Sequence, residues 1–224
     1  MKQFTFSAAL ILSVAAVAAA ETAQERLASS ADVFQQIMAT PDKGIPQDLV
    51  TKAQCVIIIP GLKKGAFIVG GEFGRGFAEC RKQDGFGWGP PAAVRVEGGS
   101  FGLQIGGSST DVVMLVMNQH GMQKLLGDKF TLGADASIAA GPVGRTANAA
   151  TDARMDAEIL AWSRAKGVFA GISLSGATLR NDADVNAELY GRKIDNKEVL
   201  SGAVEAPPAS EALRAALDKY SMRK

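Results

Sequence analysis

A serine flanked by glycines is the first arrangement in this sequence that could support catalysis. Gly98-Gly-Ser-Phe-Gly102 matches G-x-S-x-G, the strand-to-helix turn that exposes the nucleophilic serine of many hydrolases. The residues from Leu103 to Gly107 have the composition of a strand instead, and the sole histidine, His120, follows Gly102 by only 18 residues. Such hydrolases place their acid and histidine far along a longer α/β chain. We therefore expect Ser100 to be a turn residue and the protein not to be an enzyme.

Cofactor and metal chemistry have as little support. One histidine and two cysteines leave too few ligands for a Cys/His zinc site. The 25 glycines include no G-x-G-x-x-G, and Gly61-Leu-Lys-Lys-Gly65 lacks the Gly-Lys-Ser/Thr ending of a phosphate-binding loop. We expect neither a cofactor nor a metal. Nucleic acid is not an expected partner either, because 24 Lys and Arg against 23 Asp and Glu give no basic excess.

A small group of basic residues is the best candidate for a binding site. Lys63 and Lys64 occupy an expected turn between two apolar strands, and Arg75 and Lys82 lie on or after the second of these strands. Trp88 follows in a glycine-rich loop. Basic residues are attracted to anionic membranes, and Trp favours the membrane interface. The group predicts contact with anionic head groups; the alternative is that these lysines are only solvated surface charges.

The elements that must position this group are strands with helices at either end of the chain. Apolar periodicity and capping residues predict helices over 22–39, from Pro46, over 119–126 and 182–190, and after Ser210. Strands are predicted over 55–59, 112–117, 130–140 and 157–164. Residues 61–107 contain 14 glycines among regularly spaced large apolar residues, which is typical of bent strands and not of a linker. We expect a β-rich α+β domain: a curved antiparallel sheet or partly closed barrel with packed helices.

The N-terminus has the composition of an export signal. Lys2 precedes an uncharged apolar stretch from Ala8 to Ala20, which ends in three alanines before Glu21. Its 13 residues are short of the roughly 20 needed to span a bilayer. We expect residues 1–20 to be removed, and residues 21–224 to form one soluble domain that is periplasmic or secreted, or attached peripherally to a membrane.

The two cysteines leave two alternatives open. Export would place Cys55 and Cys80 in an oxidising compartment that permits a disulfide bond. A tight hairpin around Gly61 would pair position 55 with a residue near 69 and hold the two sulfurs too far apart, so a bond requires another strand order. The other alternative is two separately buried small apolar residues.

An ordered set of motifs runs from about position 25 to 191, and it includes Ile58-Ile-Pro60, Lys64-Gly-Ala-Phe67, Gly87-Trp-Gly-Pro90, Gly98-Gly-Ser-Phe-Gly102, Gly141-Pro-Val-Gly-Arg145, Ser163-Arg-Ala-Lys-Gly167 and Tyr190-Gly191. In this order they resemble the SYLF-domain family. The resemblance implies a single domain with its core over about 25–191 and a C-terminal helix over about 210–220. Its polar positions at motif residues are Lys64, Arg145 and Lys166, which join the candidate contacts.

The resemblance also implies a function. Members of the family are lipid-binding modules; eukaryotic ones bind phosphoinositides, some bind actin through neighbouring regions, and bacterial ones are often exported. We expect a non-catalytic module of the cell envelope that binds a membrane surface through anionic phospholipid or a phosphoinositide-type lipid. Actin is not expected as a partner of an exported chain. The alternative is a structural or protein-interaction domain of the periplasm that has no lipid ligand.

Overall fold

The structure is a computed structural model that describes residues 21–40, 44–66, 69–101, 106–142, 157–165, 168–169 and 174–221. The expected signal segment, residues 1–20, lies outside the described residues, as do Arg145 and Lys166. In the described part of the chain, no helix has the length and apolar character needed to cross a membrane.

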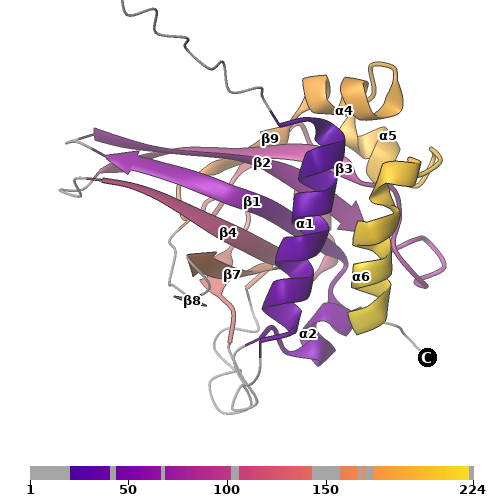
Figure 1. Cartoon of the computed structure of the whole chain (residues 1–224), viewed down its shortest axis with the longest axis horizontal. Helices are drawn as coiled ribbons and strands as arrows, with labels where there is room; N and C mark the ends of the chain where they lie inside the picture. The colour runs from indigo at the N-terminus through magenta and orange to yellow at the C-terminus, as the bar shows by residue number, and fades with distance from the viewer. Residues whose placement is uncertain are drawn as a thin grey trace, which may run out of the picture.

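One curled sheet organises the described residues (Figure 1). Its path is β5-β9-β3-β2-β1-β4-β7-β6, with β8 paired to β7. Every pairing is antiparallel except the parallel contact of β6 with β7. The α+β class and the curved sheet are thus confirmed, with a mixed rather than purely antiparallel ladder. The strands are β1 (Cys55–Ala66), β2 (Val69–Cys80), β3 (Ala92–Phe101), β4 (Gly106–Val116), β5 (Lys129–Thr131), β6 (Ile138–Ala140), β7 (Ile159–Ala165), β8 (Val168–Phe169) and β9 (Thr178–Asn181).

Helices flank the sheet at both ends of the chain, as the sequence predicts. They are α1 (Ala23–Met38), α2 (Gln47–Lys52), α3 (Gln119–Leu125), α4 (Ala183–Tyr190), α5 (Asn196–Leu200), the 3-10 helix η2 (Pro208–Ser210) and α6 (Glu211–Ser221). Local chemistry explains their starts: Thr22 and Glu25 form a capping box on α1, and the side chain of Asp182 caps α4. Gly191 ends α4 in the left-handed conformation, with φ 68°.

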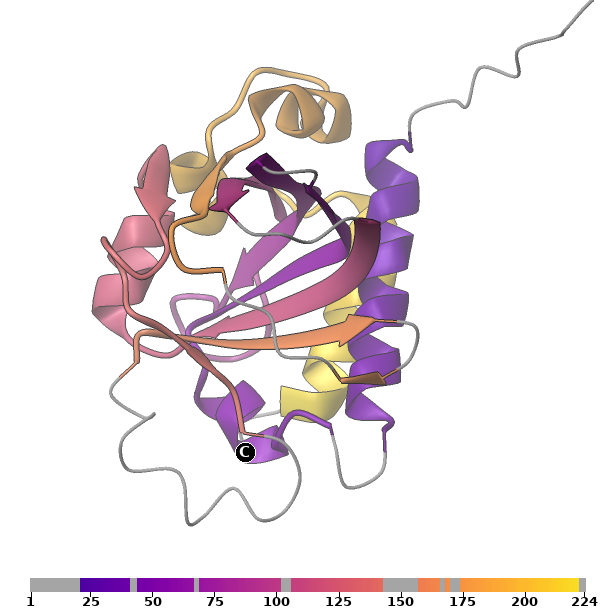
Figure 2. The same cartoon turned by 90° about the vertical axis from the view of Figure 1, so that its left-hand side faces the viewer.

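Both faces of the central strands are buried. Side chains alternate along a strand, so Ile57 and Ile59 of β1 join one core cluster, whereas Val56 and Ile58 join the cluster beneath α1 and α6. This explains why residues 55–59 form a continuous apolar run. Figure 2 shows the curl of the sheet, with α1 and α6 side by side on its outer side.

The hairpin between β1 and β2 turns elsewhere than the sequence predicts. Gly61 is not at its tip but at a bulge within β1, where it has φ 58° and the pairing register with β4 shifts between Ile59 and Leu62. The strands continue to Ala66, which pairs with Gly70. The five additional residues of β1 make position 55 the partner of position 80.

Cys55 and Cys80 therefore lie directly opposite each other, with Cα atoms 4.0 Å apart, and form a disulfide bond. The expectation that adjacent strands would hold these sulfurs apart is wrong because it rested on the misplaced turn. No other strand order is needed, and the alternative of two separately buried thiols is excluded in this structure.

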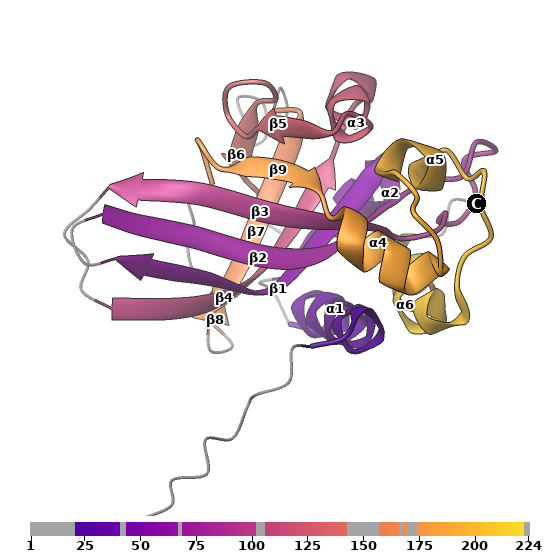
Figure 3. The same cartoon turned by 90° about the horizontal axis from the view of Figure 1, so that it is seen from above.

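The strands β1 to β4 extend well beyond the helices at one end (Figure 3). We call this the projecting end of the sheet. Toward this end, the outer surface carries the exposed side chains of Lys63 and Phe73.

Candidate functional site

Four cationic side chains form a row across four neighbouring strands. The register places Arg75 of β2 opposite Arg95 of β3, Arg95 opposite Arg180 of β9, and Arg180 opposite Lys129 of β5. Directly paired residues project from the same face of a sheet. Neighbouring strands lie about 4.8 Å apart, so the row extends over roughly 14 Å of the outer surface.

Carboxylates hold the arginines of the row in place. Arg75 Nε lies 3.0 Å from Asp182 Oδ2, Arg95 Nε lies 2.8 Å from Glu97 Oε1, and Arg180 Nη1 lies 3.1 Å from Glu97 Oε2. Each guanidinium has five N–H donors, and these contacts use only some of them. The row thus combines four cations with two ion-paired carboxylates. Further carboxylates, among them Asp128, Asp135 and Asp184, line the hollows beside Arg95, Arg180 and Lys129.

An exposed aromatic residue and a further cation adjoin the row. Phe73 is 44% exposed and lies opposite Lys63 of β1, which is also exposed. The Arg75 guanidinium carbon lies 5.8 Å from the centroid of the Phe73 ring, within range of a cation–π contact. We call the surface formed by Lys63, Phe73, Arg75, Arg95, Lys129 and Arg180 the cationic face.

Lys64 lies apart from the cationic face. Successive residues of a strand project to opposite sides, so Lys63 and Lys64 cannot share a surface. Lys64 Nζ lies 2.6 Å from the carboxylate of Glu72, whose side chain is only 6% exposed. This ion pair gives Lys64 a structural role between β1 and β2, whereas the sequence analysis placed both lysines in one exposed turn.

Trp88 is a core residue, and its expected contact with a membrane is wrong. The side chain is 1% exposed, and its indole Nε1–H donates to Ser221 Oγ at 2.9 Å. The guanidinium of Arg81 lies 4.0 Å from the ring centroid and donates to the carbonyl oxygens of Val50 and Ser221. Trp88 and Arg81 thereby join the C-terminal ends of α2 and α6 to the sheet.

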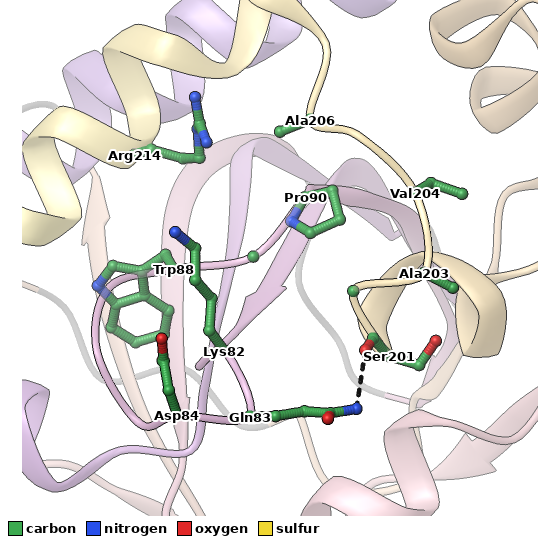
Figure 4. Close-up of a pocket in the computed structure, with 12 residues that line it drawn as sticks. Lys82, Gln83, Asp84, Trp88, Pro90, Ser201, Ala203, Val204, Ala206 and Arg214 are labelled. Atoms are coloured by element: carbon green, nitrogen blue, oxygen red, sulfur yellow. Dashed lines mark hydrogen bonds between the residues drawn. The ribbon is translucent and has the colours of Figure 1, made fainter.

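Lys82 lies at the opposite end of β2 from the cationic face. It follows Phe73 by nine residues, which corresponds to about 30 Å along an extended chain. There it lines a cavity with Trp88 (Figure 4). The sequence-predicted group is therefore divided: Lys63 and Arg75 share the cationic face, Lys64 lies behind it, Lys82 and Trp88 lie at the other end, and Arg145 and Lys166 lie outside the described residues.

The sequence analysis missed Arg95, Arg180 and Lys129. Each is an isolated cation in its own segment, and only long-range pairing brings the three together. The alternation of Val94 and Val96 with Arg95 indicated a side chain on the face opposite the core, but it could not indicate which residue lies opposite.

The two residues weighed for catalysis have other positions. Ser100 lies within β3, opposite Gly70 of β2, and is neither a turn residue nor at a strand-to-helix junction. His120 is exposed and pairs through Nδ1 with Glu158. Burial raises the pKa of Glu158. Hydrogen bonds from His120 and from the Ser137 backbone N–H together lower this pKa by more than burial raises it, so the net change is downward.

Comparisons with known proteins identify relatives across most of the chain. Residues 97–220 match the family described as "Ysc84: Las17-binding protein actin regulator". SH3 domain-containing protein PJ696.02 of Schizosaccharomyces pombe is 39% identical over 173 residues, which are 75% of this chain and 40% of the relative. LAS seventeen-binding protein 3 of Saccharomyces cerevisiae is 35% identical over 175 residues, 77% of this chain and 38% of the relative. Human SH3 domain-containing YSC84-like protein 1 is 30% identical over 182 residues, 81% of this chain and 53% of the relative. The chain spans between two fifths and about half of the length of these relatives.

Proposed function

Because this chain belongs to the Ysc84 (SYLF) family, whose members are non-catalytic, we propose that it binds anionic phospholipid surfaces through the cationic face. The observation that carries the proposal is the row of Arg75, Arg95, Arg180 and Lys129 beside the exposed Phe73. The ring lies toward the projecting end of the sheet, and the row lies beside α4 on the same outer surface.

The expected affinity is low and depends on salt. The cationic face has five cations against the two ion-paired carboxylates of Asp182 and Glu97, and the carboxylates of Asp128, Asp135 and Asp184 lie beside it, so at most three charges are uncompensated. At about 1 kcal/mol for each charge near an anionic membrane, they supply at most about 3 kcal/mol. This is less than the roughly 4 kcal/mol of a millimolar complex, so Phe73 must also enter the interface for detectable binding.

We further propose that the chain is exported and acts at the cell envelope. The apolar stretch of residues 8–20 supports this, and so does the Cys55–Cys80 disulfide bond, since such bonds persist in oxidising compartments. The expectation that actin is not a partner rests on export, whereas the matched family is described as an actin regulator. An acidic protein surface such as that of actin is therefore the second candidate for the same cationic face.

Vesicle sedimentation tests the proposal. The unmodified protein should sediment with phosphatidylglycerol vesicles at low salt and not with phosphatidylcholine vesicles. Lys63→Glu combined with Lys129→Glu should abolish sedimentation with the phosphatidylglycerol vesicles. Both lysines are exposed, and the two substitutions together change the net charge by −4. Lys52→Glu combined with Lys219→Glu is the control with the same change in charge, since both lysines are exposed, on α2 and α6, away from the cationic face.

A second variant separates apolar from electrostatic contact. Phe73→Ala should weaken binding without changing its salt dependence, because it removes no charge. Equal sedimentation of the double Glu variant and the unmodified protein would refute the cationic face as the lipid site. The second candidate would be favoured if the unmodified protein sediments with actin filaments but not with vesicles, and if the double Glu variant no longer sediments with the filaments.

A further inference from the structure

A cavity of about 600 Å³ lies at the end of the molecule opposite the projecting end. The loop between β2 and β3 forms one wall, and the segment from α5 to α6 forms the other (Figure 4). The side-chain amide of Gln83 joins the two walls by donating to the carbonyl oxygen of Ser201 at 3.4 Å. The volume of the cavity is within the range of small-molecule sites, about 300–1,000 Å³.

The lining combines an apolar surface with two cations. Val204 and Ala206 supply accessible apolar surface, and the largely buried side chains of Trp88 and Pro90 border it. Lys82 extends from the β2–β3 loop toward α6, which carries Arg214 (Figure 4). One carboxylate, that of Asp84, also lines the cavity.

Neither cation has a direct ion-pair partner within the part of the chain that the structure describes. No carboxylate there forms an ion pair within 4.0 Å of Lys82 or Arg214, whereas Arg26, Lys64 and Arg75 each have one. Nε of Arg214 is buried and has no hydrogen-bond partner among the described residues. A buried donor without a partner is costly, so a ligand that accepts its hydrogen bond would be stabilised.

A buried carboxyl of β2 also interacts electrostatically with Arg214. Glu79 of β2 is 1% exposed, and its two oxygens have no hydrogen-bond partner among the described residues. Burial raises the pKa of Glu79 well above its ordinary value, with Arg214 lowering it and Asp218 raising it to lesser extents. The carboxyl of Glu79 thus favours its protonated form more than an exposed glutamate does, which weakens its attraction for the guanidinium of Arg214.

We propose that this cavity binds a small anionic amphiphile, which has a carboxylate or phosphate head group on a short apolar body. The head group lies between Arg214 and Lys82, since a guanidinium matches the geometry of both kinds of anion. The apolar body lies along Val204 and Ala206, which Trp88 and Pro90 border. This site is independent of the cationic face, and its ligand is a single molecule rather than a membrane surface.

The site is tested by calorimetric titration of the protein with each of three ligands. Octanoate and octyl phosphate are the anions, and 1-octanol is the neutral analogue. At least one of the two anions should bind with 1:1 stoichiometry, and octanol should bind at least tenfold more weakly. The preferred anion distinguishes a fatty-acid source from a phosphate-ester source. Arg214→Gln and Lys82→Gln should each weaken binding about tenfold, whereas Lys129→Gln on the cationic face should leave it unchanged. Lys82 is exposed, so its variant keeps the test valid if Arg214→Gln destabilises the fold.

Tryptophan emission locates the ligand. The chain has two tryptophans, and Trp162→Phe leaves Trp88 as the single reporter in the cavity wall. Saturable change of its emission by the anion, lost in the Lys82→Gln background, supports the site. The proposal is overturned if neither anion binds, if octanol binds equally well, or if both Gln variants bind as the unmodified protein does. None of these results bears on vesicle sedimentation through the cationic face.

Discussion

Removal of the Cys55–Cys80 disulfide bond should lower the free energy of unfolding by about 3.5 kcal/mol. The bond joins residues 25 positions apart, and the loop-entropy relation gives about 3.5 kcal/mol at 25 °C for a loop of this length. Both cysteines are almost fully buried, so Cys55→Ala combined with Cys80→Ala keeps small apolar side chains in the core. Most of the measured loss should therefore come from the greater freedom of the unfolded chain.

Urea unfolding in the absence and in the presence of reductant measures the contribution of the disulfide bond to the free energy of unfolding. Reductant should destabilise the unmodified protein and leave the double Ala variant unchanged, which controls for other effects of the reagent. The loss on reduction should agree with the loss in the variant to within about 1 kcal/mol. A difference below about 1 kcal/mol between oxidised and reduced protein would refute the entropic argument. Two free thiols in the denatured, unreduced protein would refute the bond itself.

Two further predictions concern a buried carboxyl and a close backbone contact. The pKa of Glu79 is raised in the folded protein, so its contribution to stability is fully present below the ordinary value near 4.5 and is lost as the pH rises toward the raised pKa. Glu79→Gln should remove this loss, and the difference in unfolding free energy between variant and parent should change by up to about 1.4 kcal/mol per pH unit in that window; a difference that stays constant with pH would contradict the assignment. Gly76→Ala should cost about 1–3 kcal/mol, because the added Cβ would lie 1.9 Å from the carbonyl oxygen of Ile58. Gly99→Ala is its control in thermal unfolding, since nothing lies within 4 Å of the added Cβ, and equal melting temperatures for the two variants would count against the close contact.

The glycine-rich region illustrates how far composition alone leads. Regular large apolar residues among the glycines indicated bent strands, and the structure has β2, β3 and part of β1 and β4 there. Composition did not distinguish the roles of individual glycines. Gly61 permits a bulge, whereas Gly76 permits close approach of the Ile58 backbone, and both depend on neighbours that are distant in the sequence.

The candidate site was less accessible to sequence reasoning than the fold. Lys63 was expected in a turn, and the structure places it within β1, on the face that Arg75 of β2 shares. Trp88 and Lys64 were assigned to the surface from their residue types. Burial of Trp88 follows from the approach of α6, more than 120 residues later in the chain, whose Ser221 accepts its N–H. Residue type gives a preference for an environment, and the tertiary contacts determine which environment the residue meets.

The sequence by itself determined most of the helices and main strands, because these depend on apolar periodicity and on hydrogen bonds between residues three or four positions apart. Thr22 with Glu25, Asp182 and Gly191 are examples that need no distant partner. The sequence did not predict α5, nor the division of the strand expected over 130–140 into β5 and β6. Only the tertiary structure decided which residues lie opposite one another. The disulfide bond required the turn to lie beyond Ala66, and the row of Arg75, Arg95, Arg180 and Lys129 required three strand pairings in register. A shift of one residue in any pairing would move a cation to the other face, and register is set by cooperative packing of the whole sheet rather than by the local sequence.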